Sequence, residues 1–508
     1  MDAYRYLWDG AAVVSGVDPY AYAPARVLAA DPAREPLSEP LRRLVRLRDR
    51  GPVLRTILQR VHFAHLRTIY PPVSQAVFAL SVWAAPRGAS VRTRLLLLKA
   101  VIVLFDLGCV ALLWRLLDGL GVHPGWTVLW AWSPLVLKEF AGSSHHDVIA
   151  VFFVVCALCV SCAERFDRWN AVARWTLAGT LLALGIGAKV FPVVLIPLFA
   201  VAAWRRSGWR GTVAVTNAAG FVGAALLLPM WAASAWRPVD AQPAMELVVS
   251  DAPPVPPSRA AADDAVRPAP SDGAAGRAPG PAEDDASRVA GRVARGSWQD
   301  DGLWAFLRFW EINDWAFRVL AENLGTHASP EEDAWYAVLP KSWRNRVAER
   351  MAAWWAVPPG RSGFVAARIV TAALTGVIVL MCCCRLYRDP RAVTLLAACG
   401  ATLAWFWFLS PTQNPWYWSW ALILLPFVPN RGWLSVAPLA LLYYLRFWLA
   451  YHFAGQPLWG TPYRGAEFFD HVVVWFEHVP VLAAVALSAI ANRRRTSGSA
   501  SAPRECPS

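Results

Sequence analysis

The chain is divided into apolar runs that are long enough to cross a lipid bilayer and are joined by short polar connections. A helix needs about 20 apolar residues to span the hydrocarbon core. Within lipid, only helices or closed barrels satisfy every backbone polar group. The runs therefore predict an all-α polytopic membrane protein, with single spans at 95–117, 125–141, 147–163, 211–235, 363–385, 391–409, 415–429, 433–453 and 471–491.

Composition agrees with a membrane environment. Only 17% of the residues are charged, against about a quarter in soluble proteins. The 29 tryptophans favour the membrane–water interface, where the ring and its N–H find different solvents. The net charge of +13 comes mainly from arginines that flank apolar runs. This placement indicates membrane topology, so we expect the lipid bilayer as a partner and no nucleic acid.

One apolar stretch, 174–204, is too long for a single simple span. It is interrupted by Gly185, Gly187, Lys189 and Pro192. We therefore predict a hairpin of two helices with Lys189 near its apex. Counting it as two passes gives a bundle of about 11 membrane-crossing helices.

Charge in the short connections predicts the topology. Arginines occupy one alternate set of connections and are missing from the other, at 142–147 and 410–416. By the positive-inside rule the basic set is cytoplasmic. We expect a multi-pass protein of the plasma (inner) membrane with an external N-terminus and a cytoplasmic C-terminus. The basic set comprises 164–174, 205–210, 385–391, 430–431 and the tail at 491–495.

These assignments divide the chain into six segments. Residues 1–94 form an external first loop with interfacial helices, and the short apolar run 71–85 is an interfacial or re-entrant helix. Residues 95–235 hold the N-terminal membrane helices, and the Pro/Ala-rich stretch 236–300 is a disordered external insertion. An external amphipathic segment, 301–362, includes a helix along the outer interface at 302–324. Membrane helices at 363–492 and a cytoplasmic tail at 493–508 complete the chain.

Polar residues at membrane depth are costly and mark functional sites. Here they gather at the predicted external side, together with Tyr70, Trp416 and Tyr417, so we expect the active face to be external or periplasmic. Lys138 and Glu139, at the same end, either pair with each other or face the site. Asp106 is expected to pair with a neighbouring helix. The external polar residues are Asp2, Arg5, Asp9, Asp18, His145, His146, Asp147, Lys189, Gln413 and Asn414.

These residue types suit glycosyl transfer from a lipid phosphate. A carboxylate must deprotonate the acceptor hydroxyl, which Asp2 or Asp9 can do. Cations must stabilise the leaving phosphate, which suits Arg5, His146 and Lys189. A divalent cation is a possible cofactor because carboxylates bind one, although no dedicated metal site is visible. No Walker-type loop or dinucleotide fingerprint is present, which argues against a nucleotide donor.

Two other classes remain open. A transporter or lipid-linked-sugar flippase also uses broken helices and intramembrane charges. It predicts polar residues at mid-membrane and an internal repeat, whereas here the polar residues cluster at one face and no repeat is evident. A non-catalytic membrane scaffold would not need the grouping of carboxylates and cations.

The opening DAYRYLWDGAAVVSGVDPYAYAP resembles the first external loop of GT-C glycosyltransferases, in particular the family 87 / DUF2029 group and related polyprenol-phosphate mannosyltransferases. That loop carries Asp-x-x-Arg-Tyr-x-Trp-Asp-Gly followed by Gly-x-Asn/Asp-Pro-Tyr. Further similar elements follow in order over nearly the whole chain except 240–295. They are IYPPVSQAVFA at 69–79, FAGSSHHDVIAVFF at 140–153, LGIGAKVFPVVLIPL at 184–198, FLRFWEIND at 306–314 and LSPTQNPWYWSWALILLP at 409–426.

The resemblance implies a transferase that uses a polyprenyl-phosphate sugar, mannose being favoured, and acts on a glycan or lipid acceptor with inversion. Asp2 corresponds to the family's catalytic base. His146 stands where the family has Asn, while Asp147 is retained, and the membrane helix that precedes this loop in the family is absent before Asp2. The expected substrate-binding residues are Arg5, Tyr6, Trp8, Tyr70, His146, Asp147, Lys189, Asn414, Trp416 and Tyr417.

Overall fold

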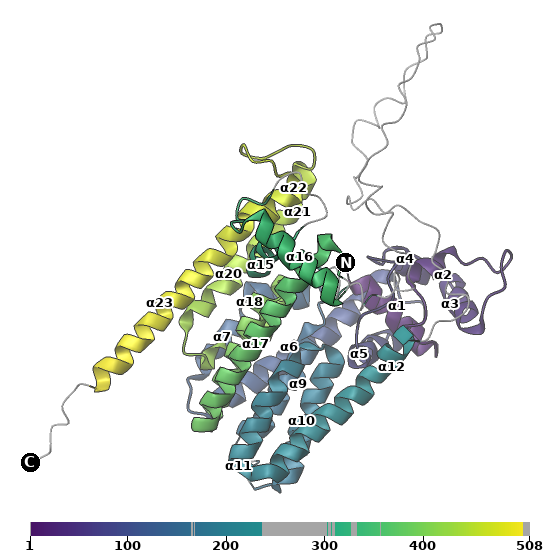
Figure 1. Cartoon of the computed structure of the whole chain (residues 1–508). Coiled ribbons are helices and arrows are strands. Elements are labelled where there is room, and N and C mark those ends of the chain that lie inside the picture. Colours follow the sequence, from purple (N-terminus) through teal and green to yellow (C-terminus); the bar gives the residue numbers. More distant parts are fainter. Residues whose placement is uncertain are drawn as a thin grey trace, which may run out of the picture.

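The chain folds into long helices with a layer of shorter helices at one end (Figure 1). This computed structural model describes residues 2–163, 166, 168–235, 302, 306, 310–326, 333–355 and 357–500. Within those ranges there is no β-strand, only two isolated bridges. The predicted insertion 236–300 lies outside the described residues.

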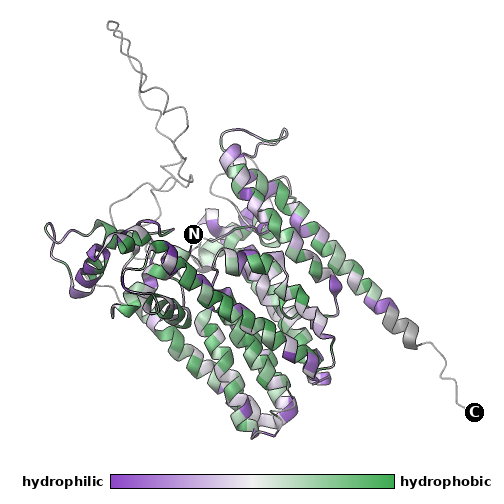
Figure 2. Cartoon of the chain, turned by 180° about the vertical axis from the view of Figure 1, so that it is seen from behind, coloured by the Kyte–Doolittle hydropathy of each residue, from purple (hydrophilic) through white to green (hydrophobic). Residues whose placement is uncertain are grey.

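Seven helices of the described part are long and apolar enough to cross a membrane. An eighth is obtained if α8–η2 (Pro134–Gly142) and α9 (Asp147–Cys162), bent by 118° at their junction, count as one span. Figure 2 shows apolar residues along the long helices and hydrophilic ones toward their ends and on the N-terminal helices. The described chain is therefore a helical multi-pass membrane protein, and the total of about 11 crossings stays a prediction.

The stretch predicted as a hairpin consists of α10 (Ala171–Ala188) and a second arm of η4 (Phe191–Leu195) and α11 (Ile196–Asn217), with Lys189 between them. Gly208 in α11 has φ +66°, so the chain turns back there. At one end of α10, Trp175 donates to Ser207 Oγ at 2.9 Å. Farther along, Gly179 and Gly187 approach Val215 and Leu226 in turn. The part after Gly208, ending in α12 (Gly223–Ala235), thus runs parallel to α10, and Phe191–Ala232 contains two arms.

Two predicted spans, 125–141 and 415–429, are wrong as single helices. The first is broken into η1 (Pro124–Thr127), α7 (Val128–Ala131), α8 (Pro134–Val136) and η2 (Leu137–Gly142). The second is broken into η8 (Pro415–Trp418), α19 (Ser419–Leu422) and η9 (Leu425–Phe427). Pro134 and Pro426 each lack the N–H that a continuing helix needs and clash with the preceding turn. The resulting bends place polar residues at helix ends.

The predicted helix over 302–324 is interrupted, because Gly302 and Phe306 are helical whereas residues 310–315 are not. Ile312 pairs with Thr412 in a parallel bridge, and helix α15 (Ala316–Leu324) begins only at Ala316. Ile312 N donates to Pro411 O, and Gln413 N donates to Ile312 O, both at 3.0 Å. Phe317 is fully buried against Phe364 of α17 (Ser362–Arg388). This segment therefore packs against the loop and α17, and its position along the outer interface stays a prediction.

Asp106 of α6 (Val91–Gly119) accepts a hydrogen bond from Trp130 Nε1 of α7 at 2.7 Å. The pairing of this carboxylate with a neighbouring helix matches the expectation from the sequence. An intramembrane carboxylate that already has an indole donor serves the packing of α6 against α7.

Three of the predicted basic connections meet at the end of the bundle away from α1. Arg174 donates to the carbonyls of Val160 and Ser161 at 3.0 and 2.8 Å. Arg206 bonds the Ser161 carbonyl at 2.5 Å and the Pro390 carbonyl at 2.9 Å. These arginines satisfy carbonyls that the end of α9 leaves unpaired. The basic face and the layer of short helices therefore lie at opposite ends of the bundle (Figure 1).

Helices α1 (Ala3–Val14) and α5 (Pro72–Trp83) pack closely in that layer. A Cβ added at Gly10 would lie 2.6 Å from the Phe78 carbonyl oxygen, which is backbone and cannot move aside alone. With 12 residues each, neither helix is long enough to cross a membrane alone.

We expect Gly10→Ala to destabilise the protein by about 1–3 kcal/mol, because the added methyl group forces α1 away from α5. The measurement is the midpoint of thermal unfolding in detergent. Gly376→Ala in α17 is the matched control, since a Cβ there meets nothing within 4 Å and alanine favours a helix. Equal midpoints for the two variants would contradict the close approach.

Candidate functional site

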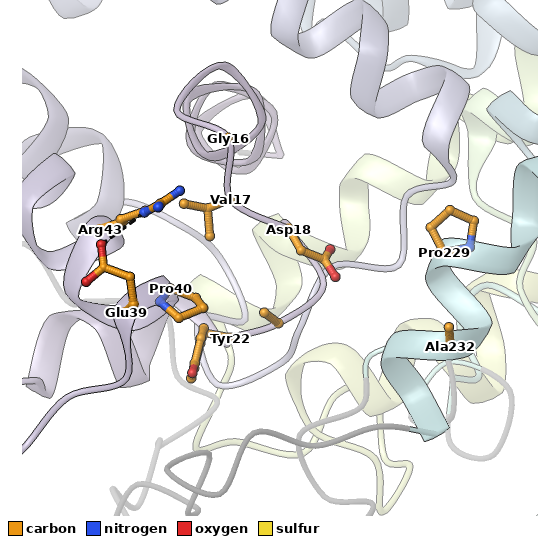
Figure 3. Close-up of a pocket in the computed structure, with 10 residues that line it drawn as sticks. Gly16, Val17, Asp18, Tyr22, Glu39, Pro40, Arg43, Pro229 and Ala232 are labelled. Carbon is orange, nitrogen blue, oxygen red and sulfur yellow. Dashed lines mark hydrogen bonds and ion pairs between the residues drawn. The ribbon is translucent and has the colours of Figure 1, made fainter.

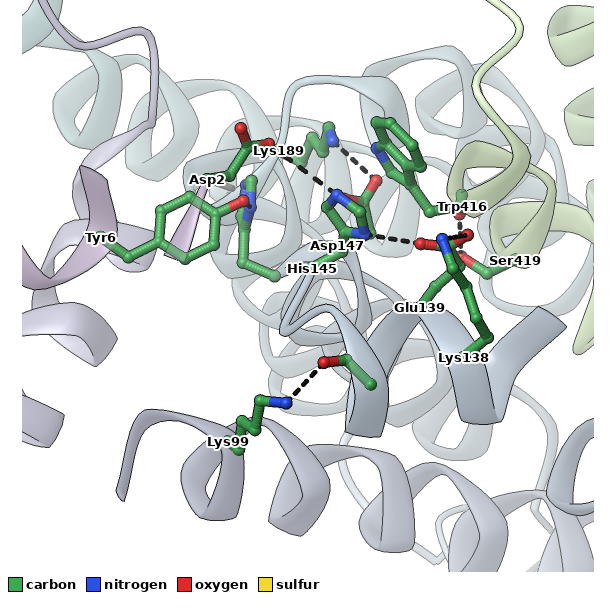
Figure 4. A network of polar contacts seen from close by, with 12 residues as sticks. Asp2, Tyr6, Lys99, Lys138, Glu139, His145, Asp147, Lys189, Trp416 and Ser419 are labelled. Carbon is green, nitrogen blue, oxygen red and sulfur yellow. Dashed lines mark hydrogen bonds and ion pairs between the residues drawn. The ribbon is translucent and has the colours of Figure 1, made fainter. Parts of the chain in front are cut away.

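The predicted site residues come from five breaks in the helices at one end of the bundle. They are the start of α1, the turn before α5, the elbow between η2 and α9, the link between α10 and η4, and the 3-10 turn η8. Figure 4 shows Asp2, Tyr6, His145, Asp147, Lys189 and Trp416 grouped around this elbow. Residues far apart in the sequence thus form one polar cluster.

Asp147 and Lys189 form the buried ion pair of the cluster. Lys189 Nζ lies 2.7 Å from Asp147 Oδ1, and only 19% and 1% of their side chains are exposed. Trp420 Nε1 donates to the same oxygen at 2.8 Å, whereas Asp147 Oδ2 is buried without a hydrogen-bond partner. The ammonium also lies 4.1 Å from the centre of the Tyr417 ring, a cation–π distance. Asp147 thus holds a cation in place and keeps one oxygen available.

Aromatic rings form one wall. Tyr6 stacks on Phe78 with centroids 4.3 Å apart and meets Tyr70 edge-on at 5.0 Å. Its hydroxyl lies 3.1 Å from His146 Nδ1, while His146 Nε2 is buried without a partner. Burial lowers the pKa of His146 well below its usual value, and the positive charges of Lys189 and His145 act in the same direction. His146 is therefore neutral near pH 7, with one ring nitrogen left over.

Asp2 is the accessible carboxylate of this group. It lies at the N-terminal end of α1, where its backbone carbonyl accepts from Tyr6 N at 3.0 Å. Its side chain is 36% exposed, and Oδ2 lies 3.8 Å from His145 Nε2. Among Asp2, Glu139 and Asp147, only Asp2 is open enough to meet a substrate hydroxyl.

Glu139 and His145 adjoin the site but were not among the predicted site residues. His145 Nδ1 lies 2.8 Å from Glu139 Oε2, and Lys138 Nζ lies 3.1 Å from Glu139 Oε1. The His145 ring stacks on Trp416 at 3.9 Å. The sequence left two alternatives for Lys138 and Glu139, pairing with each other or facing the site. Glu139 does both, since it contacts Lys138 and His145. The sequence did contain a signal for this pair, because Glu139 ends an apolar run and is followed a few residues later by His145 and His146.

Arg5, Trp8 and Asp9 lie behind the aromatic wall. Arg5 donates to the Leu66 carbonyl at 2.5 Å and lies 3.5 Å from Asp9, which also accepts from Gln75 at 3.4 Å. Trp8 is 3% exposed within the apolar core. Burial raises the pKa of Asp9, and Arg5 opposes this shift. These contacts fasten α1 to the segment before α5. The predicted substrate roles of Arg5 and Trp8 and the predicted catalytic role of Asp9 stay predictions.

The loop before η8 contacts the polar cluster on one side and helix α23 on the other. Trp416 and Tyr417 face His145 and Lys189, and the Asn414 carbonyl accepts from Tyr417 N at 3.0 Å. Gln413 turns away, because its Oε1 lies 2.5 Å from His478 Nε2 and its amide donates to the Phe408 carbonyl at 2.9 Å. Asn414 and the two aromatic residues therefore belong to the cluster, whereas Gln413 packs against α23 (Val474–Ala500).

A cavity of about 650 Å³ lies elsewhere, between the loop after α1, helix α3 (Glu39–Asp49) and α12 (Figure 3). None of the predicted site residues lines it. Asp18 does, and burial raises its pKa. The cavity is therefore separate from the polar cluster.

In the part of the chain that the structure describes, no group of three His, Cys, Asp or Glu side chains is arranged to hold a metal ion. Asp2 lies near His145, Glu139 contacts Lys138, and Asp147 contacts Lys189. Each carboxylate of the cluster thus has a basic side chain beside it.

Residues 1–206 match the family model described as Alpha-(1->6)-mannopyranosyltransferase, N-terminal domain, of the MptA_B family. The match includes Asp2, Glu139, His145, Asp147 and Lys189. It supports mannosyl transfer as the function, and hence glycosyltransferase activity with a sugar donor and an acceptor, and it does not favour a transporter. No curated protein and no solved structure matches the chain.

We expect Lys189→Met to destabilise the protein by about 3–5 kcal/mol, because it leaves the buried Asp147 carboxylate without its cation. Combining it with Asp147→Asn removes both charges and restores most of this loss. The measurement is the thermal unfolding midpoint of each variant. Lys341→Met is the control, since that ammonium is 70% exposed and 3.6 Å from Asp333. A double variant as unstable as Lys189→Met would contradict the pairing.

Stability should also depend on pH through His146. The unfolded chain takes up this proton near pH 6.5, whereas the native chain does so only at lower pH. The contribution of neutral His146 to the free energy of unfolding is complete above about pH 6.5, and it is lost as the pH falls from there toward the pKa of the native state. We expect the thermal unfolding midpoint of His146→Asn, which keeps a hydrogen-bond partner for Tyr6, to decrease less than that of the wild type as the pH is lowered.

The exposed His452→Asn variant serves as the control and should keep the wild-type slope. Identical slopes in all three proteins would show that His146 takes up its proton as easily when folded as when unfolded.

Proposed function

We propose that this protein transfers mannose from a polyprenyl-phosphate donor to a glycan or lipid acceptor at the outer face of the plasma membrane. A half-open carboxylate, Asp2, in the same cluster as a buried cation, Lys189, is the observation that carries the proposal. The mannosyltransferase match over residues 1–206 supports the sugar. The ordered motifs that resemble family 87 of the GT-C enzymes support the lipid-phosphate donor.

In this mechanism Asp2 accepts the proton of the acceptor hydroxyl as its oxygen attacks the anomeric carbon. The bond from that carbon to the phosphate oxygen breaks, and the polyprenyl phosphate leaves with the bonding electrons. A single direct displacement inverts the configuration at the anomeric carbon. Exposure favours Asp2 over Asp9 as the base, since Asp9 is 3% exposed and paired with Arg5.

Lys189 and His146 stabilise the leaving phosphate. The Lys189 ammonium has three N–H donors, and Asp147 occupies one of them. His146 Nε2 is buried without a partner. When Nδ1 accepts from the Tyr6 hydroxyl, Nε2 carries the proton of the neutral ring and donates to a phosphate oxygen. Asp147 Oδ2 is also buried without a partner and, because it only accepts, suits a sugar hydroxyl. Tyr70, Trp416 and Tyr417 provide rings against which a sugar packs, whereas Tyr6, which is 1% exposed and stacked on Phe78, supports them from behind.

The positive-inside rule, applied to the folded chain, supports an external location of this site. Arg174 and Arg206 gather at the end of the bundle away from the Asp2 cluster. If the arginine-rich end is cytoplasmic, Asp2 lies at the outer leaflet and the C-terminus inside. A donor that is anchored in the membrane then reaches the site from the lipid phase.

The test is an assay of the purified protein with radiolabelled polyprenyl-phosphate-mannose and a panel of glycan and lipid acceptors. We expect transfer by the wild type and a loss of about 10²–10⁴-fold in kcat for Asp2→Asn, the range for removal of a general base. Asp31→Asn, which alters a 46% exposed carboxylate paired with Arg34, is the control and should keep full activity.

Wild-type protein that transfers no mannose to any acceptor would refute the proposal. Equal activity of Asp2→Asn and Asp31→Asn would refute the role of Asp2 and leave transfer itself in place.

A further inference from the structure

His145 lies between two carboxylates. Its Nδ1 is 2.8 Å from Glu139 Oε2, and its Nε2 is 3.8 Å from Asp2 Oδ2. Figure 4 shows the three side chains in a line, with dashed contacts on either side of the imidazole ring. Three different positions supply them, namely the start of α1, the π-helix η2 and the elbow before α9.

Contacts on the ring fix its tautomer and its orientation. A carboxylate beside Nδ1 requires a proton on that nitrogen, because an ionised carboxylate only accepts hydrogen bonds. In the neutral ring the lone pair is then on Nε2, which faces Asp2. Trp416 stacks on the ring at 3.9 Å with an angle of 11° between the planes, which prevents it from turning.

We propose that Glu139 and His145 form a proton relay behind Asp2, in which His145 receives the proton that Asp2 takes from the acceptor. This inference rests on the proposed transferase function and assigns two residues to the same site. Glu139 is a positioning residue, since it touches neither substrate nor Asp2.

The steps balance as follows. The acceptor oxygen forms its bond to the anomeric carbon and gives its proton to Asp2, while the phosphate oxygen takes the electrons of the broken bond. Because 3.8 Å separates Asp2 Oδ2 from His145 Nε2, the proton then passes between them through one water molecule. Glu139 stabilises the resulting imidazolium. Asp2 is thereby returned to its ionised state for the next turnover, and His145 finally releases the proton to water through its 11% exposed side chain.

Other charged groups around His145 are compatible with this role. On its own segment His146 is neutral near pH 7, and Asp147 is neutralised by Lys189. From η2, Lys138 contacts the oxygen of Glu139 that His145 does not use. Tyr443 is close enough to Glu139 and Asp2 to interact with both electrostatically, and Tyr6, Tyr70 and Tyr417 interact with Asp2 in the same way. At the end of η2, the Lys99 ammonium donates to the Gly142 carbonyl at 2.5 Å. The two carboxylates are therefore the negative groups nearest to the ring.

In a purely structural role, Glu139 would only stabilise the turn between η2 and α9 through its contacts with Lys138 and His145. It predicts loss of folding without any change in the response of the enzyme to pH. The relay predicts an effect on proton transfer that passes through Asp2. Catalytic measurements on stable variants separate the two.

The experiment compares kcat and KM of Glu139→Gln and His145→Asn across a range of pH with the labelled mannose donor. We expect kcat to fall about 10–100-fold in each, as for other residues that orient a functional side chain, with KM for the donor unchanged. In Glu139→Gln the acidic limb of the kcat profile moves to lower pH, because the imidazolium loses its stabilising carboxylate. In His145→Asn the remaining acidic limb reports Asp2 alone, because a protonated Asp2 cannot accept the proton of the acceptor hydroxyl.

Two further measurements do not depend on the profile. Adding imidazole should restore activity to His145→Ala and leave His123→Ala, which alters a histidine outside the site, unaffected. In a protein that already carries Asp2→Asn, Glu139→Gln should cause no further loss, since the residues act as one unit.

Additive losses in the double variant, an unchanged acidic limb and no rescue by imidazole would overturn the relay. Such a result with an active, Asp2-dependent wild type leaves the proposed function standing. A wild type without transferase activity would instead refute the proposed function on which the relay rests.

Discussion

The contact on which the site depends is the buried ion pair between Asp147 and Lys189. It joins the first residue of α9 to the link between α10 and η4, and Trp420 of α19 donates to the same carboxylate. A charge in such surroundings is stable only when it is paired and hydrogen-bonded. The pair therefore fixes three segments relative to one another. His145, His146 and Tyr417 are positioned by the same segments.

Helix breaks are the second structural device. Prolines divide two apolar stretches that would otherwise be continuous helices, and the chain turns sharply between η2 and α9. Backbone polar groups freed at such breaks are tolerated in a membrane protein only where protein or water satisfies them. The turn between η2 and α9 lies where polar side chains gather, whereas Pro426 lies beside Arg431, whose guanidinium donates to the Pro426 carbonyl at 3.4 Å.

Two layers of residues surround Asp2. Tyr70, His146 and Lys189 belong to the layer that a substrate would contact, with unpartnered atoms on His146 and Asp147. Behind it, Arg5 and Asp9 fasten α1, and Glu139 with Lys138 fixes His145. Under the proposed function, the first layer would bind or react and the second would hold it in position, as precise catalysis requires.

The sequence by itself determined the helical membrane class, because apolar runs of span length permit no other backbone arrangement in lipid. It also placed Asp2, His146, Asp147, Lys189, Trp416 and Tyr417 at one end, since their positions between runs follow from span length. Only the tertiary structure decided that Arg5 and Asp9 pair with each other away from the open side, and that His145 lies between Glu139 and Asp2. Hydropathy assigns a residue to a depth in the membrane. The direction in which its side chain points depends on how the broken helices pack. That packing is set by contacts between segments more than 100 residues apart.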